Sequence, residues 1–347
     1  MAPHPVNSAG MAAPVRRAFD VFNGDADGIC ALHQLRLAHP ADAQLITGVK
    51  RDIELLQRIP CEGETDVTVL DVSLDANVNA LRRILDTGGR VTYFDHHSAR
   101  LAFQHQRLQL FWDEAPDVCS SILVDRHLNG QYRQWAVTAA FGDNLPAIGR
   151  ALAQDIGLSE SRTKALAELG LILNYNAYGE KVEDLHIAPD ALYRAVHQFI
   201  DPQDFIDTSP CYCVLADGFR NDAARMANLT PDWQSACGAI YILPNAPWAR
   251  RISGVFANQL ISQQQARAYA VLTENTDGSY VVSVRSADPA ARAANGLCER
   301  FPGGGGRKAA AGINRLPANE LDKFIQTFSD YFTMNGTTIA DGTAHAR

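Results

Sequence analysis

The stretch from Tyr93 to His97 ends a short strand-like run in one carboxylate and two adjacent imidazoles, Asp95, His96 and His97. The end of a strand is where an α/β sheet presents ligands to a crevice. A carboxylate beside imidazoles suits a divalent cation that activates water. The alternative interpretation is a satisfied hydrogen bond between Asp and His in the core, without any ligand.

Two further carboxylates, Asp25 and Asp27, lie one residue apart in the loop Asn23–Gly28. Between glycines, two such side chains can reach toward two different cations. The alternative is an ordinary surface turn rich in Asp and Asn. An EF-hand is excluded, because Gln34 or Arg36 stands near the twelfth position, where that motif needs Glu.

Asp71 and Asp143 each end an apolar run, where a buried acid is costly unless it is paired or bound to a metal. For Asp71 the alternative role is a helix N-cap, but Ser73 and Asp75 are better placed for it. Asp143 follows Ala136–Phe141, and a simple turn aspartate is its alternative role. Both acids are therefore candidate metal ligands.

A glycine run near the C-terminus leads into two basic residues: Gly303, Gly304, Gly305, Gly306, Arg307 and Lys308. Consecutive glycines let backbone N–H groups approach an anion closely, and the two cations add charge. No Walker arrangement is present. A flexible linker is the alternative, but the run continues directly into Ala309–Gly312 and a further helix. We expect a phosphate-binding segment.

The N-terminal half alternates strands and helices, which predicts a largely parallel sheet. Strands are expected at 18–22, 44–49, 66–72 and 89–95, and helices at 29–38, 52–59 and 77–86. The loops that carry the acids then follow the carboxyl ends of strands and converge on one crevice. A mainly helical region follows, with helices expected at 117–127, 134–141, 146–156, 159–174 and 189–200.

A second alternating block has strands at 238–243, 266–274 and 280–285 and helices at 248–263, 290–300 and 317–331. The residues 275–278 form a hairpin signal between two of these strands. The expected fold class is α/β: a mostly parallel sheet with flanking helices, a smaller C-terminal α+β domain and an active-site cleft between them. The expected divisions are a flexible extension (1–17), a catalytic domain (18–205), a linker (206–235), a substrate-binding domain (236–333) and a flexible tail (334–347).

Composition limits the function classes that the chain can serve. A net charge of −8 argues against broad, non-specific binding of duplex nucleic acid. No apolar run reaches the roughly 20 residues that cross a bilayer, and the first 17 residues do not read as a signal peptide. The seven cysteines contain no CxxC pair, which favours buried free thiols in a cytoplasmic protein over a thiolate zinc site.

In this order and number, the motifs resemble those of the DHH phosphoesterase superfamily over about residues 18 to 332. Asn23–Gly28 is similar to the first motif, Asp71 to the second, Asp95–His97 to the third and Gly142–Asp143 to the fourth. Three segments resemble the DHH-associated C-terminal domain: Gly303–Gly312, Arg251–Asn258, and Ser283–Ser286, which is similar to its substrate-contacting strand.

The resemblance implies two divalent cations, Mn²⁺ in the first instance, with Mg²⁺ or Co²⁺ as alternatives. The implied metal ligands are Asn23, Asp25, Asp27, Asp71, His96 and Asp143, with Asp71 bridging. His97 would lie beside the scissile phosphate, and Asp95 would orient the imidazoles. Two positions depart from the family pattern: Asn23 stands where a His is usual, and Arg307 stands where the glycine run usually ends in His. An amide is a weaker ligand than imidazole for a transition metal.

We therefore expect a metal-dependent phosphoesterase that hydrolyses phosphodiester bonds of short oligonucleotides or linear dinucleotides. The implied substrate contacts are Arg285, Ser286, Gly303, Gly304, Gly305, Gly306, Arg307, Lys308 and Arg251. A RecJ-like single-strand exonuclease is one alternative, and a catalytically silent nucleotide-binding module is another. A homodimer fits the sequence as well as a monomer. The segment Asn174–Glu180 fits a lid, a dimer contact or ordinary packing.

Overall fold

The computed structural model describes residues 16–60, 64–100, 104–263 and 267–333. The expected tail 334–347 lies outside the described residues, as do residues 1–15 of the expected extension. Arg17, which the prediction placed in that extension, is the first residue of β1.

The N-terminal domain is built on a parallel sheet of five strands in the order β2-β1-β3-β4-β5. The strands are β1 Arg17–Phe22, β2 Gln44–Ile46, β3 Thr65–Leu70, β4 Arg90–Asp95 and β5 Leu108–Trp112. The strand order reverses between β1 and β3, so the connections that leave these two strands diverge and open a crevice at their carboxyl ends.

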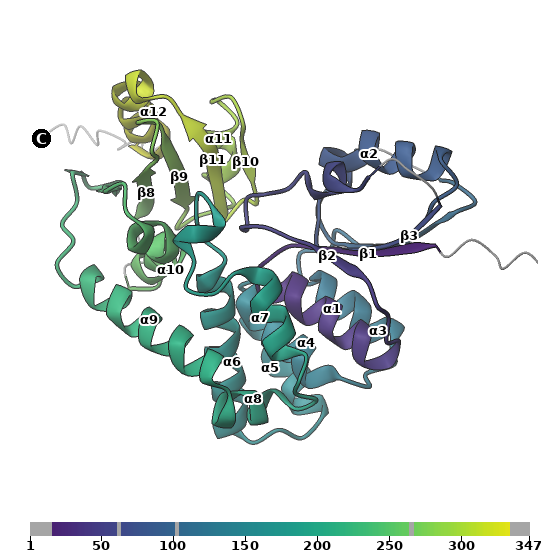
Figure 1. The fold of residues 1–347 in the computed structure, drawn as a ribbon. Coiled ribbons are helices and arrows are strands. Elements are labelled where there is room, and N and C mark those ends of the chain that lie inside the picture. The colour runs from purple at the N-terminus through teal and green to yellow at the C-terminus, as the bar shows by residue number, and fades with distance from the viewer. Residues whose placement is uncertain (1–15, 61–63, 101–103, 264–266, 334–347) are drawn as a thin grey trace, which may run out of the picture.

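Alternate residues of the central strands enter two cores on opposite faces of the sheet. Phe22, Leu70 and Phe94 pack on one face, and the preceding residues Val21, Val69 and Tyr93 pack on the other. Both faces are apolar because helices cover both, as a parallel sheet requires. On the first face lie α1 (Ala26–Ala38) and α3 (Ser120–His127), and on the second lie α2 (Leu74–Asp86) and the 3₁₀ turn η1 (Leu55–Arg58) (Figure 1).

The helical region continues the first face of the sheet (Figure 1). Its elements are α4 Arg133–Gly142, α5 Pro146–Asp155, α6 Glu160–Asn176, η2 Val182–Asp184, α7 Pro189–Val196, α8 Pro202–Thr208 and α9 Pro210–Met226. The linker expected over 206–235 is therefore mostly helix. Pro202 and Pro210 each stand at the start of a helix, where the missing N–H costs nothing, so they begin helices and do not break them.

The C-terminal domain has a mixed sheet of six strands in the order β10-β11-β9-β8-β7-β6. The strands are β6 Trp233–Gln234, β7 Gly238–Leu243, β8 Ala268–Glu274, β9 Tyr280–Arg285, β10 Gly304–Gly306 and β11 Ala310–Leu316. Only β7 and β8 run parallel. The helical elements are α10 Pro247–Gln263, α11 Ala294–Cys298, η3 Ala318–Glu320 and α12 Leu321–Thr333.

The expected fold class is confirmed: a parallel α/β domain is followed by a smaller α+β domain. Several details differ from the sequence-based expectation. The helix expected at 52–59 is only the short turn η1. The strands β5, β6 and β11 and the helices α8 and α9 were not expected. The glycine run is the edge strand β10 and not an open loop. Within the described part of the chain, every helix is too short or too polar to span a bilayer.

Candidate active site

The acidic residues of the N-terminal domain meet at the carboxyl ends of β1, β3 and β4. Asp25 caps α1 directly after β1, Asp71 follows β3, and Asp95 ends β4. Strands β1 and β3 are neighbours in the sheet, and β3 pairs with β4. The topological switch point therefore brings these side chains to one crevice.

His96 lies at the centre of a cluster of three carboxylates. Its Nε2 is 3.4 Å from Asp71 Oδ1, 3.9 Å from Asp27 Oδ2 and 3.9 Å from Asp143 Oδ2. The side chains of Asp27, Asp71 and His96 are almost fully buried, and Asp143 is 17% exposed. Residues from three separate strand ends and one helix end thus converge on one point. We call these four residues the His96 cluster.

The His96 cluster is short of positive charge. Burial raises the pKa of Asp27, and the nearby carboxylate of Asp71 raises it further. Burial and the charge of Asp25 likewise raise the pKa of Asp71. Asp143 Oδ2 is buried and has no hydrogen-bond donor among the described residues. The site thus combines crowded carboxylates, an imidazole and an Asp143 oxygen that accepts no hydrogen bond from the described residues. Such groups fit a divalent cation, which would offset the repulsion between the carboxylates.

The N-terminus of α3 holds Asp27 in place. The backbone N–H groups of Ser120 and Ser121 donate to its two oxygens, each over 2.7 Å. Ser120 Oγ also lies 3.4 Å from Asp71 Oδ1. Asp71 itself has a positive φ of 59°, a strained conformation for a residue with a Cβ. The surrounding contacts therefore fix both carboxylates at some cost in backbone energy.

Asp95 is fully buried and orients its neighbours. Its Oδ1 accepts from the His96 backbone N–H at 2.9 Å and lies 2.7 Å from His97 Nδ1, and its Oδ2 accepts from Leu74 N at 3.3 Å. Asp95 thus fills the N-cap role at α2, where the Ser73 side chain makes no capping bond. Burial lowers the pKa of His97, but the bond to Asp95 outweighs burial and raises that pKa to about 9. The His97 side chain is 43% exposed, and its raised pKa favours the protonated form at neutral pH.

A second group of polar residues adjoins the His96 cluster, and in this group a carboxylate is paired with a lysine. Asp25 Oδ1 accepts from the backbone N–H groups of Asp27 and Gly28 at 3.0 and 3.1 Å, and its Oδ2 accepts from Lys50 Nζ. Burial would raise the pKa of Asp25, but the Lys50 ammonium holds it below its usual value. Asn23 Nδ2 donates to the Lys50 carbonyl at 3.2 Å, and Asn23 Oδ1 has no partner among the described residues.

Lys50 was not expected from the sequence, because it lies outside every motif that carried chemistry. Its Nζ also donates to Asn174 Oδ1 at 2.9 Å and lies 5.6 Å from the centre of the Tyr178 ring. Burial opposes the charge of Lys50, but Asp25 raises its pKa well above the ordinary value. The segment Asn174–Glu180, whose role was left open, thus contacts Lys50 through Asn174 and Tyr178.

The glycine run brings a cation from the C-terminal domain to the His96 cluster. β10 and β11 form a tight hairpin, in which Arg307 N donates to Ala310 O at 2.9 Å. Gly306 has a φ of 134°, and a Cβ there would approach Ala311 Cα to 2.6 Å, so only glycine fits. The hairpin places Arg307 Nη2 3.3 Å from His96 Nδ1 and 3.6 Å from Asp143 Oδ2. Lys308 is exposed on the same turn.

Two further guanidinium groups from different domains lie close enough to influence each other. Arg285 Nε donates to Asn258 Oδ1 at 2.7 Å, and Arg51 Nη1 donates to Asn314 Oδ1 at 2.8 Å. Burial lowers the pKa of Arg51, and the charge of Arg285 lowers it further. Burial also lowers the pKa of Arg285. Arg51 was missed because a single arginine in a loop carries no sequence signal.

Two of the residues expected to contact the substrate, Arg251 and Ser286, form hydrogen bonds within the protein. Arg251 Nε donates to Asp222 Oδ2 at 2.8 Å, and its Nη1 donates to the Asp184 carbonyl. Arg251 is 8% exposed, so it joins α10 to α9 and η2 and does not face the cleft. Ser286 Oγ donates to the Arg292 carbonyl. Arg251 and Ser286 therefore differ from the prediction, because buried donors are satisfied by the acceptors that folding brings to them.

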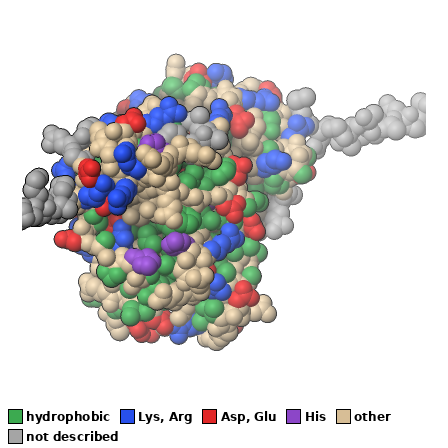
Figure 2. Space-filling model, turned by 90° about the vertical axis from the view of Figure 1, so that its right-hand side faces the viewer, with side chains coloured by type: hydrophobic (Ala, Val, Ile, Leu, Met, Phe, Trp, Pro, Cys, Tyr) green, Lys and Arg blue, Asp and Glu red, His purple; other side chains and the backbone are tan. Residues whose placement is uncertain are grey.

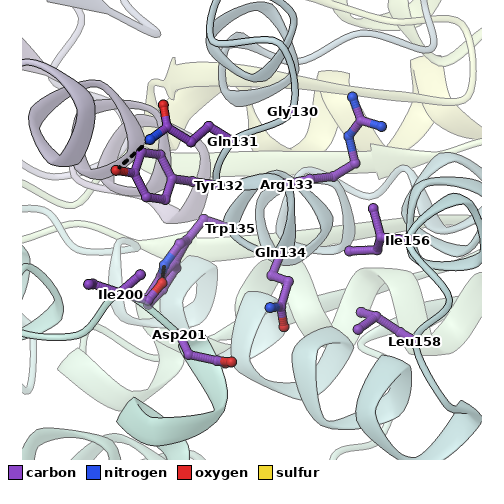
Figure 3. A pocket seen from close by; sticks show the side chains of 10 residues that line it. All are labelled: Gly130, Gln131, Tyr132, Arg133, Gln134, Trp135, Ile156, Leu158, Ile200 and Asp201. Atoms are coloured by element: carbon purple, nitrogen blue, oxygen red, sulfur yellow. Dashed lines mark hydrogen bonds between the residues drawn. The ribbon is translucent and has the colours of Figure 1, made fainter.

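A surface pocket of about 310 Å³ lies elsewhere, between α4, the end of α5 and the start of α8 (Figure 3). Gln131, Tyr132, Trp135 and Asp201 line it, and no residue of the His96 cluster does. Gln131 Nε2 donates to Tyr132 Oη across its rim. We assign no chemistry to this pocket.

On the face shown in Figure 2, acidic and basic side chains are interspersed.

Residues 238–334 match the DHHA1 domain family. Solved structures match over nearly the whole chain. The chain has the fold of the DHH superfamily. The match confirms the predicted DHH-associated C-terminal domain, and the fold over nearly the whole chain agrees with the predicted superfamily.

Three of these structures cover most of this chain. A DHH-domain protein described as a member of the s1p family of ribosomal proteins is 14% identical, with a TM-score of 0.62, over 91% of this chain and 86% of that one. An exonuclease RecJ bound to manganese is 17% identical, with a TM-score of 0.56, over 92% of this chain and 91% of that one. The pGpG-specific phosphodiesterase PggH from Vibrio cholerae is 13% identical, with a TM-score of 0.50, over 91% of this chain and 100% of that one. No curated protein matches the chain in sequence.

Proposed function

We propose that this protein, which has the fold of the DHH superfamily, is a metal-dependent phosphoesterase. It would hydrolyse phosphodiester bonds of short oligonucleotides or linear dinucleotides. The observation that carries the proposal is the position of Arg307 beside the His96 cluster. An acidic metal-ligand set in one domain faces a phosphate-binding cation from the other. A phosphate ester held by Arg307 would lie next to the residues that hold the cation.

The four residues of the His96 cluster, Asp27, Asp71, His96 and Asp143, would hold a divalent cation, which we propose to be Mn²⁺. Such a cation supplies Lewis-acid polarisation of a phosphoryl oxygen and acidifies the attacking water. The exonuclease RecJ bound to manganese shares this fold. Ser120 and Ser121 keep Asp27 oriented toward the cluster through their backbone N–H groups.

His97 and the arginines provide the positive charge that surrounds the substrate. The His97 imidazolium, held by Asp95, can donate to a phosphoryl oxygen or to the leaving oxygen as negative charge grows there. Arg307 can bind a non-bridging oxygen, and Arg51 and Arg285 can bind a second phosphate of the same substrate. Two phosphate-binding places separated by one nucleoside are what a dinucleotide needs.

Charge and surface support a short substrate. The net charge is −8, and both signs are interspersed on the face in Figure 2, which offers long nucleic acid no extended basic track. PggH, a phosphodiesterase specific for the linear dinucleotide pGpG, shares the fold. A RecJ-like exonuclease is the second candidate, and the fold shared with the manganese-bound RecJ supports it.

The test is a substrate screen with Mn²⁺ present, comparing dinucleotides, oligonucleotides of two to five residues, long single strands, phosphomonoesters and polyphosphate. We expect the highest kcat/KM for the shortest diesters, and a loss of about a hundredfold or more in the Asp71→Ala variant. Preference for long single strands, with a steep dependence on salt, would favour the exonuclease. Dinucleotide binding without any product would instead favour a silent binding module.

A further inference from the structure

Asp25, one of the metal ligands that the superfamily resemblance implies, is already neutralised within this chain. Asp25 accepts two backbone N–H bonds at Oδ1 and the Lys50 ammonium at Oδ2. The Asp25 carboxylate thus accepts three hydrogen bonds, one of them from an ammonium group. Its charge is already paired, and one lone-pair site remains, so Asp25 is a poorer ligand for a second cation than the acids of the His96 cluster.

Lys50 is held firmly in this position. Asn23, which stands where the family pattern has His, donates through Nδ2 to the Lys50 carbonyl at 3.2 Å. At the other end of Lys50, Asn174 Oδ1 accepts from Nζ at 2.9 Å, and the Tyr178 ring lies 5.6 Å away. Residues that follow β1, a residue of α6 and a residue just after α6 therefore combine to fix one lysine.

We propose that Lys50 takes the place of one of the two cations, so that the chain binds a single divalent cation at the His96 cluster. This inference rests on the proposed function, because that function requires a cation at the cluster. The ammonium supplies one positive charge where the second cation would supply two. Asn23 and Lys50 then act together: Asn23 stands in place of a strong metal ligand and positions the lysine that replaces the metal.

Lys50 also keeps one hydrogen-bond donor free in this arrangement. An ammonium group has three N–H donors, and Asp25 and Asn174 take two of them. The third N–H is available to a phosphoryl oxygen, since no further hydrogen-bond acceptor of Nζ occurs among the described residues. Lysine binds phosphate as a point charge, which suits the equatorial oxygens of a transferring phosphoryl group.

The test counts metal ions without using activity. Isothermal titration and electron paramagnetic resonance with Mn²⁺ alone should give close to one ion per wild-type chain, with the spectrum of an isolated ion. The double variant Asn23→His with Lys50→Met, which restores the imidazole and removes the ammonium, should bind a second ion and show a spin-coupled pair. Lys164→Met, on the exposed surface of α6, is the matched control and should keep one ion. Thermal unfolding checks that every variant is folded.

The outcomes separate this inference from the proposed function. Two coupled Mn²⁺ ions in the wild type would overturn the inference and leave the phosphoesterase intact. A single ion in both the wild type and a folded double variant would also overturn it, because Lys50 would then not be what excludes the second ion. One ion in the wild type and two in the double variant, without hydrolysis of any diester, would sustain the inference and reject the proposed function. No Mn²⁺ binding at all would reject both.

Discussion

The guanidinium of Arg307 lies 3.6 Å from the carboxylate of Asp143, measured from Nη2 to Oδ2, and the two residues belong to different domains. Asp143 caps the end of α4 in the N-terminal domain, and Arg307 turns the hairpin between β10 and β11. The contact closes the side of the His96 cluster that faces the C-terminal domain. It also places a permanent cation next to the proposed metal ligands.

Replacing Arg307 should weaken substrate binding more than it slows the chemical step. In Arg307→Ala we expect KM for a dinucleotide to rise about tenfold, because a charge-assisted contact to phosphate is lost. We also expect tighter Mn²⁺ binding, since a cation beside Asp143 is removed. Arg315→Ala removes an exposed arginine of β11 that pairs with Asp277, and both values should stay unchanged there. An unaltered KM in Arg307→Ala would argue against the phosphate contact.

Asp71→Asn should make the metal-free protein more stable while abolishing activity. The amide removes one charge from crowded carboxylates that raise the pKa of Asp71, and Asn tolerates the positive φ. We expect a gain of about 1 kcal/mol, or about 1–2 °C in the thermal midpoint without metal. Mn²⁺ should then stabilise the wild type but not the variant. Asp66→Asn, at a half-exposed position of β3, is the control. A lower midpoint in Asp71→Asn would contradict this account of the cluster.

Arg251→Ala should unfold the protein more easily and should not act mainly on KM. Its side chain is 10% exposed and pairs with Asp222, which also accepts from Tyr175 Oη. Removing one partner of a buried ion pair costs about 3–5 kcal/mol, because the other charge stays buried without compensation. Urea unfolding measures this cost. Arg220→Ala breaks the exposed pair with Asp217 and should cost almost nothing. Normal stability with a raised KM in Arg251→Ala would restore Arg251 as a substrate contact.

The stability of the protein should depend on pH through His33. This side chain is fully buried against Trp135, its Nδ1 lies 3.1 Å from His197 Nδ1, and its Nε2 lies 2.9 Å from Phe199 O. Burial lowers its pKa from 6.5 to about 3. The folded chain therefore keeps His33 neutral, whereas the unfolded chain binds a proton below about pH 6.5. The stabilisation is fully present above that pH and is lost as the pH falls toward the folded-state pKa.

The measurement compares urea unfolding of the wild type and His33→Gln at neutral pH and at about pH 4.5. We expect the wild type to lose about 2 kcal/mol more than the variant over this interval, because one pKa unit corresponds to about 1.4 kcal/mol. The glutamine side chain can still donate to the Phe199 carbonyl, so the variant should fold. Equal losses in the two proteins would show that His33 does not carry this dependence.

Much of the fold followed from local patterns. The alternation of strands and helices before residue 95 predicted a parallel sheet, and the period-two packing of Val21 and Phe22 on opposite faces agrees with it. The linker predicted over 206–235 is mostly helix, and Pro202 and Pro210 each begin a helix. A proline that starts a helix and a proline that interrupts a linker look alike in sequence.

The sequence by itself determined which acids stand at strand ends, since strand length and side-chain alternation are local properties of the chain. It thereby indicated Asp25, Asp71 and Asp95 as neighbours at one edge of the sheet. Only the tertiary structure decided which positively charged side chain lies beside each acid. Lys50 reaches Asp25 and Asn174 across 25 and 124 residues of chain, and Arg307 reaches His96 across 211. Such pairings depend on how separate elements pack together, and no local pattern of residues encodes them.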